Sequence, residues 1–168
     1  MTRVCILGAE STGKTTLAKA LAERFETVWV PEYGAVYHHR GRGDPTRPWT
    51  DDEFVHIAVI QNWLEDFLAQ FAQRLLFCDT DAYTTAVFAE LYLGHPVPAL
   101  AEHARAYGLY VLCDAETPFE RDPLGLRRQD AREDMDRRYR ERVREVGAPL
   151  VEVRGPTDER VEQVVAAL

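Results

Sequence analysis

The loop Gly8-Ala9-Glu10-Ser11-Thr12-Gly13-Lys14-Thr15 decides the fold of this 168-residue chain. An apolar run, Arg3 to Leu7, precedes the loop, and apolar residues at helical spacing follow it from Thr16 to Arg24. The pattern G-x-x-x-x-G-K-T between a strand and a helix is a P-loop, whose backbone N–H groups and helix N-terminus hold phosphates. The expected ATP-binding residues of this segment are Gly8, Glu10, Ser11, Thr12, Gly13, Lys14, Thr15 and Thr16.

The loop also predicts where the phosphoryl group and its metal ion are held. Lys14 can reach the β- and γ-phosphates of ATP, and the Thr15 hydroxyl suits Mg²⁺. Lys14 is one of only two lysines in an arginine-rich chain, which indicates that the amine is chemically required there. A second magnesium-side carboxylate is expected at a neighbouring strand end, and Asp79 follows the apolar run Leu75–Cys78. Thr15 and Asp79 are therefore the candidate metal site; otherwise Asp79 only caps the next helix.

Apolar runs typical of buried strands alternate with helical patterns along the whole chain. The expected strands are 3–7, 27–30, 75–78, 109–113 and 150–153. The expected helices are 16–24, one opened by the capping box Thr50–Glu53, 82–93, one ending near Tyr107, one ending near Val146 and one beginning at Pro156, with 38–49 as a loop. This order predicts a three-layer α/β fold of the P-loop NTPase type, with a five-stranded parallel sheet and helices on both faces, as in nucleotide kinases. We expect one domain, residues 1–168.

The acceptor of the phosphoryl group is expected at the same sheet edge. Glu32 follows the second strand, so its carboxylate can orient an acceptor hydroxyl or take its proton. The pattern does not decide whether Glu32, Asp79 or Asp81 is that base. Aromatic side chains near these positions can stack on a flat substrate ring. The aromatic candidates are Tyr33, Tyr37, Trp63 and Tyr83.

Two later segments complete the predicted site. Residues 116–130 follow the fourth strand, where nucleotide kinases place a lid, and Arg121 and Arg127 there can neutralise charge on the transferring phosphoryl group. Arg154 and Pro156 follow the fifth strand and are expected near the adenine of ATP. The other arginines after Arg132 are interpreted as a solvated helix face paired with acidic residues.

Composition excludes several classes of protein. A formal net charge of −8 argues against a general nucleic-acid binder. No apolar run reaches the length of about 18 residues that a membrane span requires, so we expect a cytoplasmic protein with no membrane partner. Three widely spaced cysteines are read as buried, reduced thiols. A GTPase would need an Asn-Lys-x-Asp signature that this chain lacks, and the pattern leaves homo-oligomer formation open.

The motifs together resemble the ribosylnicotinamide kinase domain of the NadR family. The resemblance rests on the Glu10-Ser11-Thr12 interior of the P-loop, on Pro31-Glu32-Tyr33, on Asp79-Thr80-Asp81 and on the segment Pro118–Arg127. It implies ATP- and Mg²⁺-dependent phosphorylation of the 5′-hydroxyl of nicotinamide riboside to nicotinamide mononucleotide. It also implies substrate contacts, which we expect from Glu32, Tyr33, Tyr37, Asp81, Tyr83 and Asp122. The lid departs from the family pattern at Phe119, where a Trp is usual.

Two alternatives stay open at this point. The chain can be a kinase of another small nucleoside or metabolite, since a P-loop says only that phosphates are held. It can also be an ATP-binding regulatory module with little turnover. Glu32 and the arginine lid argue for the enzyme, because a sensor needs neither.

Overall fold

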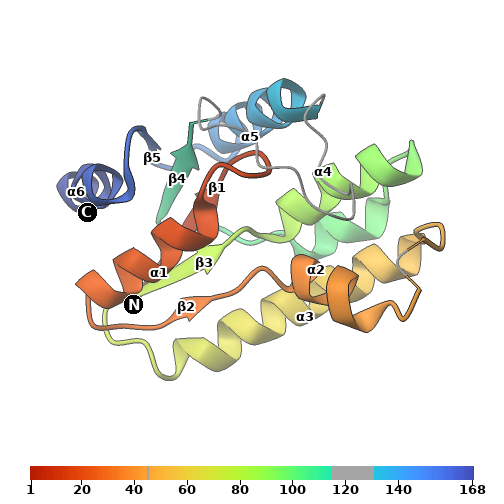
Figure 1. Ribbon diagram of the computed structural model, residues 1–168, viewed down its shortest axis with the longest axis horizontal. Helices are drawn as coiled ribbons and strands as arrows, with labels where there is room; N and C mark the ends of the chain where they lie inside the picture. Colours follow the sequence, from red (N-terminus) through yellow and green to blue (C-terminus); the bar gives the residue numbers. More distant parts are fainter. Residues whose placement is uncertain (45, 115–130) are drawn as a thin grey trace.

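A parallel five-stranded sheet forms the centre of the molecule, in the order β2-β3-β1-β4-β5 (Figure 1). The computed structural model describes residues 1–44, 46–114 and 131–168. The strands are β1 (Thr2–Leu7), β2 (Trp29–Val30), β3 (Leu75–Asp79), β4 (Leu109–Cys113) and β5 (Leu150–Val153). The predicted five parallel strands are confirmed, although the second is shorter than expected because only Trp29 and Val30 pair with β3.

Helices cover both faces of the sheet, as the alternating pattern predicted (Figure 1). They are α1 (Lys14–Arg24), α2 (Tyr33–Val36), α3 (Asp51–Ala69), α4 (Ala82–Leu93), α5 (Arg132–Val146) and α6 (Thr157–Ala167), with a π-helical turn η1 (Tyr37–Gly41) and a 3₁₀ helix η2 (Pro98–His103). Side chains of β1 alternate between two cores. Val4 and Ile6 pack with α1 and α6, whereas Cys5 and Leu7 pack with α3, α4 and α5. This is the three-layer arrangement of a doubly wound sheet.

The register of the central strands positions the site. Ile6 of β1 lies opposite Asp79 of β3, so the end of β3 stands directly beside the start of the P-loop. Thr80, the next residue, donates its N–H to the Ile6 carbonyl at 3.1 Å. The carboxyl ends of β1 and β3 therefore meet at one edge, where ligands bind in open parallel sheets.

Two expectations of secondary structure were wrong. The segment expected as a loop from residue 38 begins with η1, which continues α2 without a break. The helix expected to reach Tyr107 is the shorter η2, which ends at His103. Its terminal carbonyl accepts a hydrogen bond from Asn62 Nδ2 at 2.8 Å, so the last turn is held by a side chain rather than by further helix.

The other long helices lie where the sequence indicated, although α1 begins at Lys14 rather than Thr16 and α3 ends at Ala69. Thr50 and Glu53 form the predicted capping box at the start of α3. The arginines of α5 pair with acidic neighbours, for example Arg140 with Asp136, which is the solvated face that was predicted. Cys5, Cys78 and Cys113 are free and buried, and burial raises the pKa of each thiol. Within the described ranges, no helix has the length and apolarity to span a membrane.

Candidate active site

The phosphate loop is a closed turn between β1 and α1. Gly8 and Gly13 have φ angles of 152° and 84°, which favour glycine, and Ser11 also has a positive φ of 60°. A Cβ at Gly8 would lie 2.6 Å from Thr12 Oγ1 and 3.0 Å from the Cys113 carbonyl oxygen. Thr12 donates its hydroxyl to the Ala9 carbonyl at 2.8 Å. The loop can therefore hold this shape only with glycine at its first position.

Lys14 projects from the first turn of α1 into the loop. Its Nζ donates to the Ala9 carbonyl at 3.0 Å, and the residue is buried while still lining a cavity. A buried ammonium group that donates to a carbonyl is well suited to exchange that partner for phosphate oxygens. The predicted position of Lys14 beside the phosphate site is thus consistent with its geometry.

Thr15 and Asp79 meet at the junction of β1 and β3. The Thr15 hydroxyl donates to Asp79 Oδ2 at 2.5 Å, while buried Asp79 Oδ1 has no hydrogen-bond partner among the described residues. Burial raises the pKa of Asp79, and the Lys14 charge and the Thr15 hydrogen bond offset part of this rise. An orphaned carboxylate oxygen beside a hydroxyl fits a magnesium ion whose other ligands come from phosphate and water. No cluster of three His, Cys, Asp or Glu side chains suited to a metal occurs in the described part of the chain.

Arg160 of α6 connects a second loop to the phosphate loop, and no local sequence motif predicts this role. Its Nη1 donates to the Thr12 carbonyl at 2.6 Å and its Nε to the Gly155 carbonyl at 2.7 Å. The turn between β5 and α6 therefore lies beside the P-loop. Arg154 and Pro156 of this turn do not line the cavity: the Arg154 side chain is 66% exposed and pairs with Asp114 at 3.2 Å, and Pro156 caps α6. Their contact with adenine stays a prediction.

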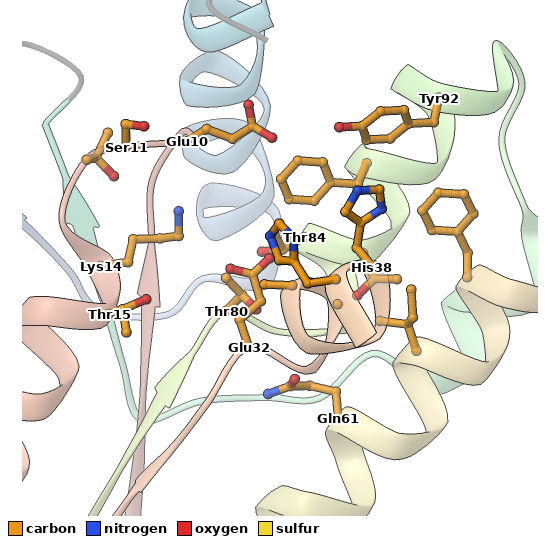
Figure 2. A pocket seen from close by; sticks show the side chains of 18 of the residues that line it. Glu10, Ser11, Lys14, Thr15, Glu32, His38, Gln61, Thr80, Thr84 and Tyr92 are labelled. Atoms are coloured by element: carbon orange, nitrogen blue, oxygen red, sulfur yellow. The ribbon is translucent and has the colours of Figure 1, made fainter. Parts of the chain in front are cut away.

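A cavity of 440 Å³ extends from the P-loop to a wall of aromatic rings (Figure 2). At the phosphate end it is lined by Glu10, Ser11, Thr12, Gly13, Lys14, Thr15 and Thr16. Glu32, Gln61, Thr80, Thr84 and Thr85 line its middle, and His38, His39, Trp49, Phe54, Ile57, Phe88 and Tyr92 also border it. Figure 2 shows Lys14 and Glu32 facing the same space from different loops. One cavity therefore joins the predicted phosphate site to the predicted acceptor carboxylate.

Thr80 stands between these two groups in an unusual conformation. Its φ is 70°, a left-handed value that is rare for a β-branched residue, and its side chain lines the cavity. Such conformations persist where the surrounding structure imposes them, often at functional sites. Here the hydrogen bond to Ile6 and the capped start of α4 hold Thr80 in this strained conformation beside the phosphate loop.

The aromatic wall comes from residues that the sequence did not single out. Trp49 lies in the loop before α3, and its ring centroid is 4.9 Å from that of Phe54 and 5.7 Å from that of Tyr92. His38 of η1 stacks on Trp49 at 5.3 Å with an interplanar angle of 23°. The wall combines η1, the following loop, α3 and α4, and no local pattern reveals such a combination.

Arg42 fixes the loop that carries Trp49. Its guanidinium lies 3.8 Å from the Trp49 ring centroid and donates to the carbonyls of Arg47 and Pro48 at 2.6 Å and 3.0 Å. Arg42 Nε also donates to Glu53 Oε1 at 3.0 Å. Burial alone would raise the pKa of Glu53, but the Arg42 hydrogen bond and charge outweigh it and hold that pKa below its usual range. Trp49 is thus held in a defined orientation.

The aromatic residues expected to stack on a substrate ring do not line this cavity, and their contact with a substrate stays a prediction. Tyr33 and Tyr37 turn toward α3, where their hydroxyls contact His56 Nε2 at 3.1 Å and Glu53 Oε1 at 3.2 Å. Tyr83 donates to the Arg138 carbonyl of α5 at 3.3 Å. Trp63 is 56% exposed and stacks on Phe67 at the molecular surface. The orientation of each ring is set by the helix that carries it. The distance in sequence from Glu32 does not predict that orientation.

Asp81 also has a different position from the one expected for a substrate contact. It caps α4, with Oδ1 accepting from the Thr84 N–H at 2.8 Å and the Thr84 hydroxyl at 2.9 Å. Burial raises the pKa of Asp81, while the Thr84 hydrogen bonds oppose the rise. Asp81 does not line the cavity, but its cap positions Thr84 and Thr85, which do. The predicted lid residues Arg121, Asp122 and Arg127 lie outside the described residues.

Comparison with known proteins identifies a family and relatives of this chain. A family model described as "AAA domain" matches residues 3–160. The chain is 36% identical over 126 residues to the trifunctional NAD biosynthesis/regulator protein NadR of Salmonella typhimurium, and the match covers 72% of this chain and 30% of that protein. The chain thus spans about a third of the curated relatives it matches.

Solved structures share the fold. A crystal structure of NadR protein in complex with NR superposes with a TM-score of 0.79 at 19% identity, covering 98% of this chain and 49% of that one. Thymidylate kinase from Ehrlichia chaffeensis superposes with a TM-score of 0.66 at 11% identity, covering 99% and 97% of the two chains. The predicted nucleotide-kinase type of P-loop fold is confirmed.

Proposed function

Since the chain belongs to the AAA domain family and is related to NadR proteins, we propose that this ATP-dependent phosphotransferase phosphorylates the 5′-hydroxyl of nicotinamide riboside. The product would be nicotinamide mononucleotide. The observation that carries the proposal is the single cavity with Lys14 and Thr15 at one end, Glu32 between, and four aromatic rings beyond.

The phosphate end supplies what the donor requires. Phosphoryl transfer is catalysed mainly by positioning and by neutralising charge on the transferring group. Lys14 would exchange its bond with the Ala9 carbonyl for the β- and γ-phosphates of ATP. Thr15 and Asp79 would hold Mg²⁺, which offsets charge on the phosphates. The Oδ1 of Asp79, which has no hydrogen-bond partner among the described residues, supports this assignment.

Glu32 is the carboxylate we assign to the acceptor hydroxyl. It precedes α2, lines the cavity and faces the space that Lys14 also faces (Figure 2). Of the three candidate carboxylates, Glu32 is the one that lines the cavity, whereas Asp79 binds Thr15 and Asp81 caps α4. Glu32 is then the group best placed to accept the proton of the attacking oxygen.

The aromatic wall matches the chemistry of the nicotinamide ring. That ring is planar and cationic in nicotinamide riboside, and aromatic faces attract planar cations. Trp49 and Tyr92, whose centroids are 5.7 Å apart, would contact the ring. The NR bound in the related NadR structure supports the same choice of acceptor. A single kinase domain over residues 1–168 is part of this proposal, and its predicted lid at 116–130 lies outside the described residues.

The experiment is a panel of acceptors offered to the purified chain with ATP and Mg²⁺. We expect ADP release to be stimulated at least about tenfold more by nicotinamide riboside than by uridine, thymidine or deoxyadenosine. Equal stimulation by thymidine or deoxyadenosine would make the chain a kinase of other nucleosides. ATP binding without turnover on any acceptor would favour a regulatory module.

A further inference from the structure

Gln61 is a buried side chain of the cavity whose amide has a fixed orientation. It lies on α3 and is 1% exposed. Its Oε1 accepts the Tyr33 backbone N–H at 2.9 Å. A flipped amide would set two N–H groups against each other, so the –NH₂ group must point the other way.

The Nε2 of Gln61 is a donor without a partner. It is buried and makes no hydrogen bond to any residue of 1–44, 46–114 or 131–168. A buried unsatisfied donor is costly, and native structures keep one where a ligand or an ordered water completes it. Figure 2 shows the amide reaching from α3 toward the strand ends, below Glu32. The residue that carries this donor therefore borders the cavity on the side of Glu32 and the strand ends.

The face of α3 relates this donor to the rest of the acceptor site. Phe54, Ile57 and Gln61 are spaced by three and four residues, so they share one helix face and all line the cavity. Phe54 belongs to the aromatic wall, whereas Gln61 contacts the segment that begins with Glu32. A nucleoside with its base at the wall and its 5′-oxygen at Glu32 would place its sugar between these ends.

We propose, on the basis of the function proposed above, that Gln61 Nε2 donates to the oxygen of a secondary ribose hydroxyl of the acceptor. The donor suits a secondary hydroxyl better than the attacking oxygen, because donating to that oxygen would weaken it as a nucleophile. The consequence is selection for ribonucleosides. A site that pairs a substrate hydroxyl rejects the analogue lacking it, since the buried donor is then left without a partner.

Gln61→Glu tests the role because a glutamate keeps an acceptor for the Tyr33 N–H and removes the donor. For the wild type we expect the 2′-deoxy or the 3′-deoxy form of the acceptor to raise KM about tenfold. We expect Q61E to raise the KM of the parent ribonucleoside by a similar factor, with the KM for ATP unchanged. In Q61E the same deoxy analogue should not raise the nucleoside KM further, because the substitution and the missing hydroxyl remove the same hydrogen bond.

Three results would overturn the proposal: a wild type indifferent to both deoxy analogues, a Q61E variant with an unchanged nucleoside KM, or losses that multiply for both analogues. Gln61→Met provides a second variant without the donor if Q61E does not fold. If neither folds, the wild-type comparison of the analogues decides alone.

The proposal can fail independently of the acceptor assignment. If nicotinamide riboside is not phosphorylated, the proposed function fails. The comparison of wild type and Q61E with parent and deoxy nucleosides is then made with whichever ribonucleoside the wild type phosphorylates. If it phosphorylates none, the binding of adenosine and uridine is measured by calorimetry instead. Absence of both turnover and ribonucleoside binding counts against Gln61 as well.

Discussion

The two ends of the cavity are built in different ways. The phosphate end is one continuous loop, Gly8–Thr15, joined to one carboxylate, Asp79, by the register of β1 and β3. The acceptor end is assembled from four separate segments around Trp49. The first end depends on backbone shape and the second on side chains packed across helices. We therefore expect the binding of ATP and the choice of acceptor to respond to different substitutions.

The strongest test of this separation is Lys14→Ala. Loss of the ammonium group removes charge neutralisation at the phosphates, and we expect kcat to fall about 10³-fold with every acceptor. Steady-state kinetics with two nucleosides measures this. Lys19→Ala is the matched control, because the other lysine is exposed and lies over Trp29, where its loss should leave kcat within about twofold. A fall in kcat with only one of the two nucleosides would show that Lys14 also affects the choice of acceptor, which would contradict the separation of the two ends.

Glu32→Gln tests the group that lies where the ends meet. An amide cannot take the proton of the attacking hydroxyl, so we expect kcat to fall about 10²-fold or more. The KM for ATP should stay near the wild-type value, since Glu32 does not belong to the P-loop. Rapid-quench measurement of a single turnover isolates the chemical step. A decrease of less than about threefold would remove Glu32 as the base.

Trp49→Ala tests the acceptor end alone. We expect the KM for nicotinamide riboside to rise about tenfold, because an aromatic face for a cationic ring is lost, while the KM for ATP is unchanged. The matched control is Trp63→Ala, which removes an exposed tryptophan of the adjoining helix and should change neither constant. Equal effects of the two substitutions would contradict the assigned wall.

Glu65→Gln tests a buried group away from both ends and should affect stability only. Burial raises the pKa of Glu65 from 4.5 to about 7, and the Tyr107 hydrogen bond and the charges of Arg105 and Arg3 offset this only in part. Because the pKa is raised in the folded state, protonated Glu65 contributes about 3 kcal/mol to the free energy of unfolding below pH 4.5. This contribution is lost as pH rises through 7.

Glutamine stays neutral and can still accept the Tyr107 hydroxyl, so this loss should vanish in the variant. Urea unfolding at pH 5 and pH 8 measures it. Because pH 5 already lies above 4.5, the stability of the variant relative to the wild type should be about 2.5 kcal/mol greater at pH 8 than at pH 5. Parallel pH dependence of both proteins would show that Glu65 does not titrate in this range.

The contrast between the ends also explains what the sequence could predict. Strands and most helices follow from local periodicity, and the P-loop is a local motif, so both were predictable. Asp79 and Asp81 look alike in the sequence. Only the register of β3 against β1 and the cap on Thr84 separate their roles.

The acceptor wall could not be predicted for a similar reason. Trp49 is the last residue of a segment expected as a loop, and Phe88 and Tyr92 lie on α4, which is apolar on most sides. Helical periodicity identifies Phe54, Ile57 and Gln61 as one face of α3 but does not say that the face borders a cavity. Tyr33 and Tyr37 are close to Glu32 in sequence, yet their helix turns them toward α3.

Direct observation of the product tests the central claim. The chain is incubated with ATP, Mg²⁺ and nicotinamide riboside, and phosphorus NMR follows the γ-phosphate. We predict a new phosphate monoester, split by the two 5′-methylene protons, that forms in equal amount to ADP. Release of ADP with inorganic phosphate alone, or no reaction with nicotinamide riboside while another nucleoside is phosphorylated, would contradict the account.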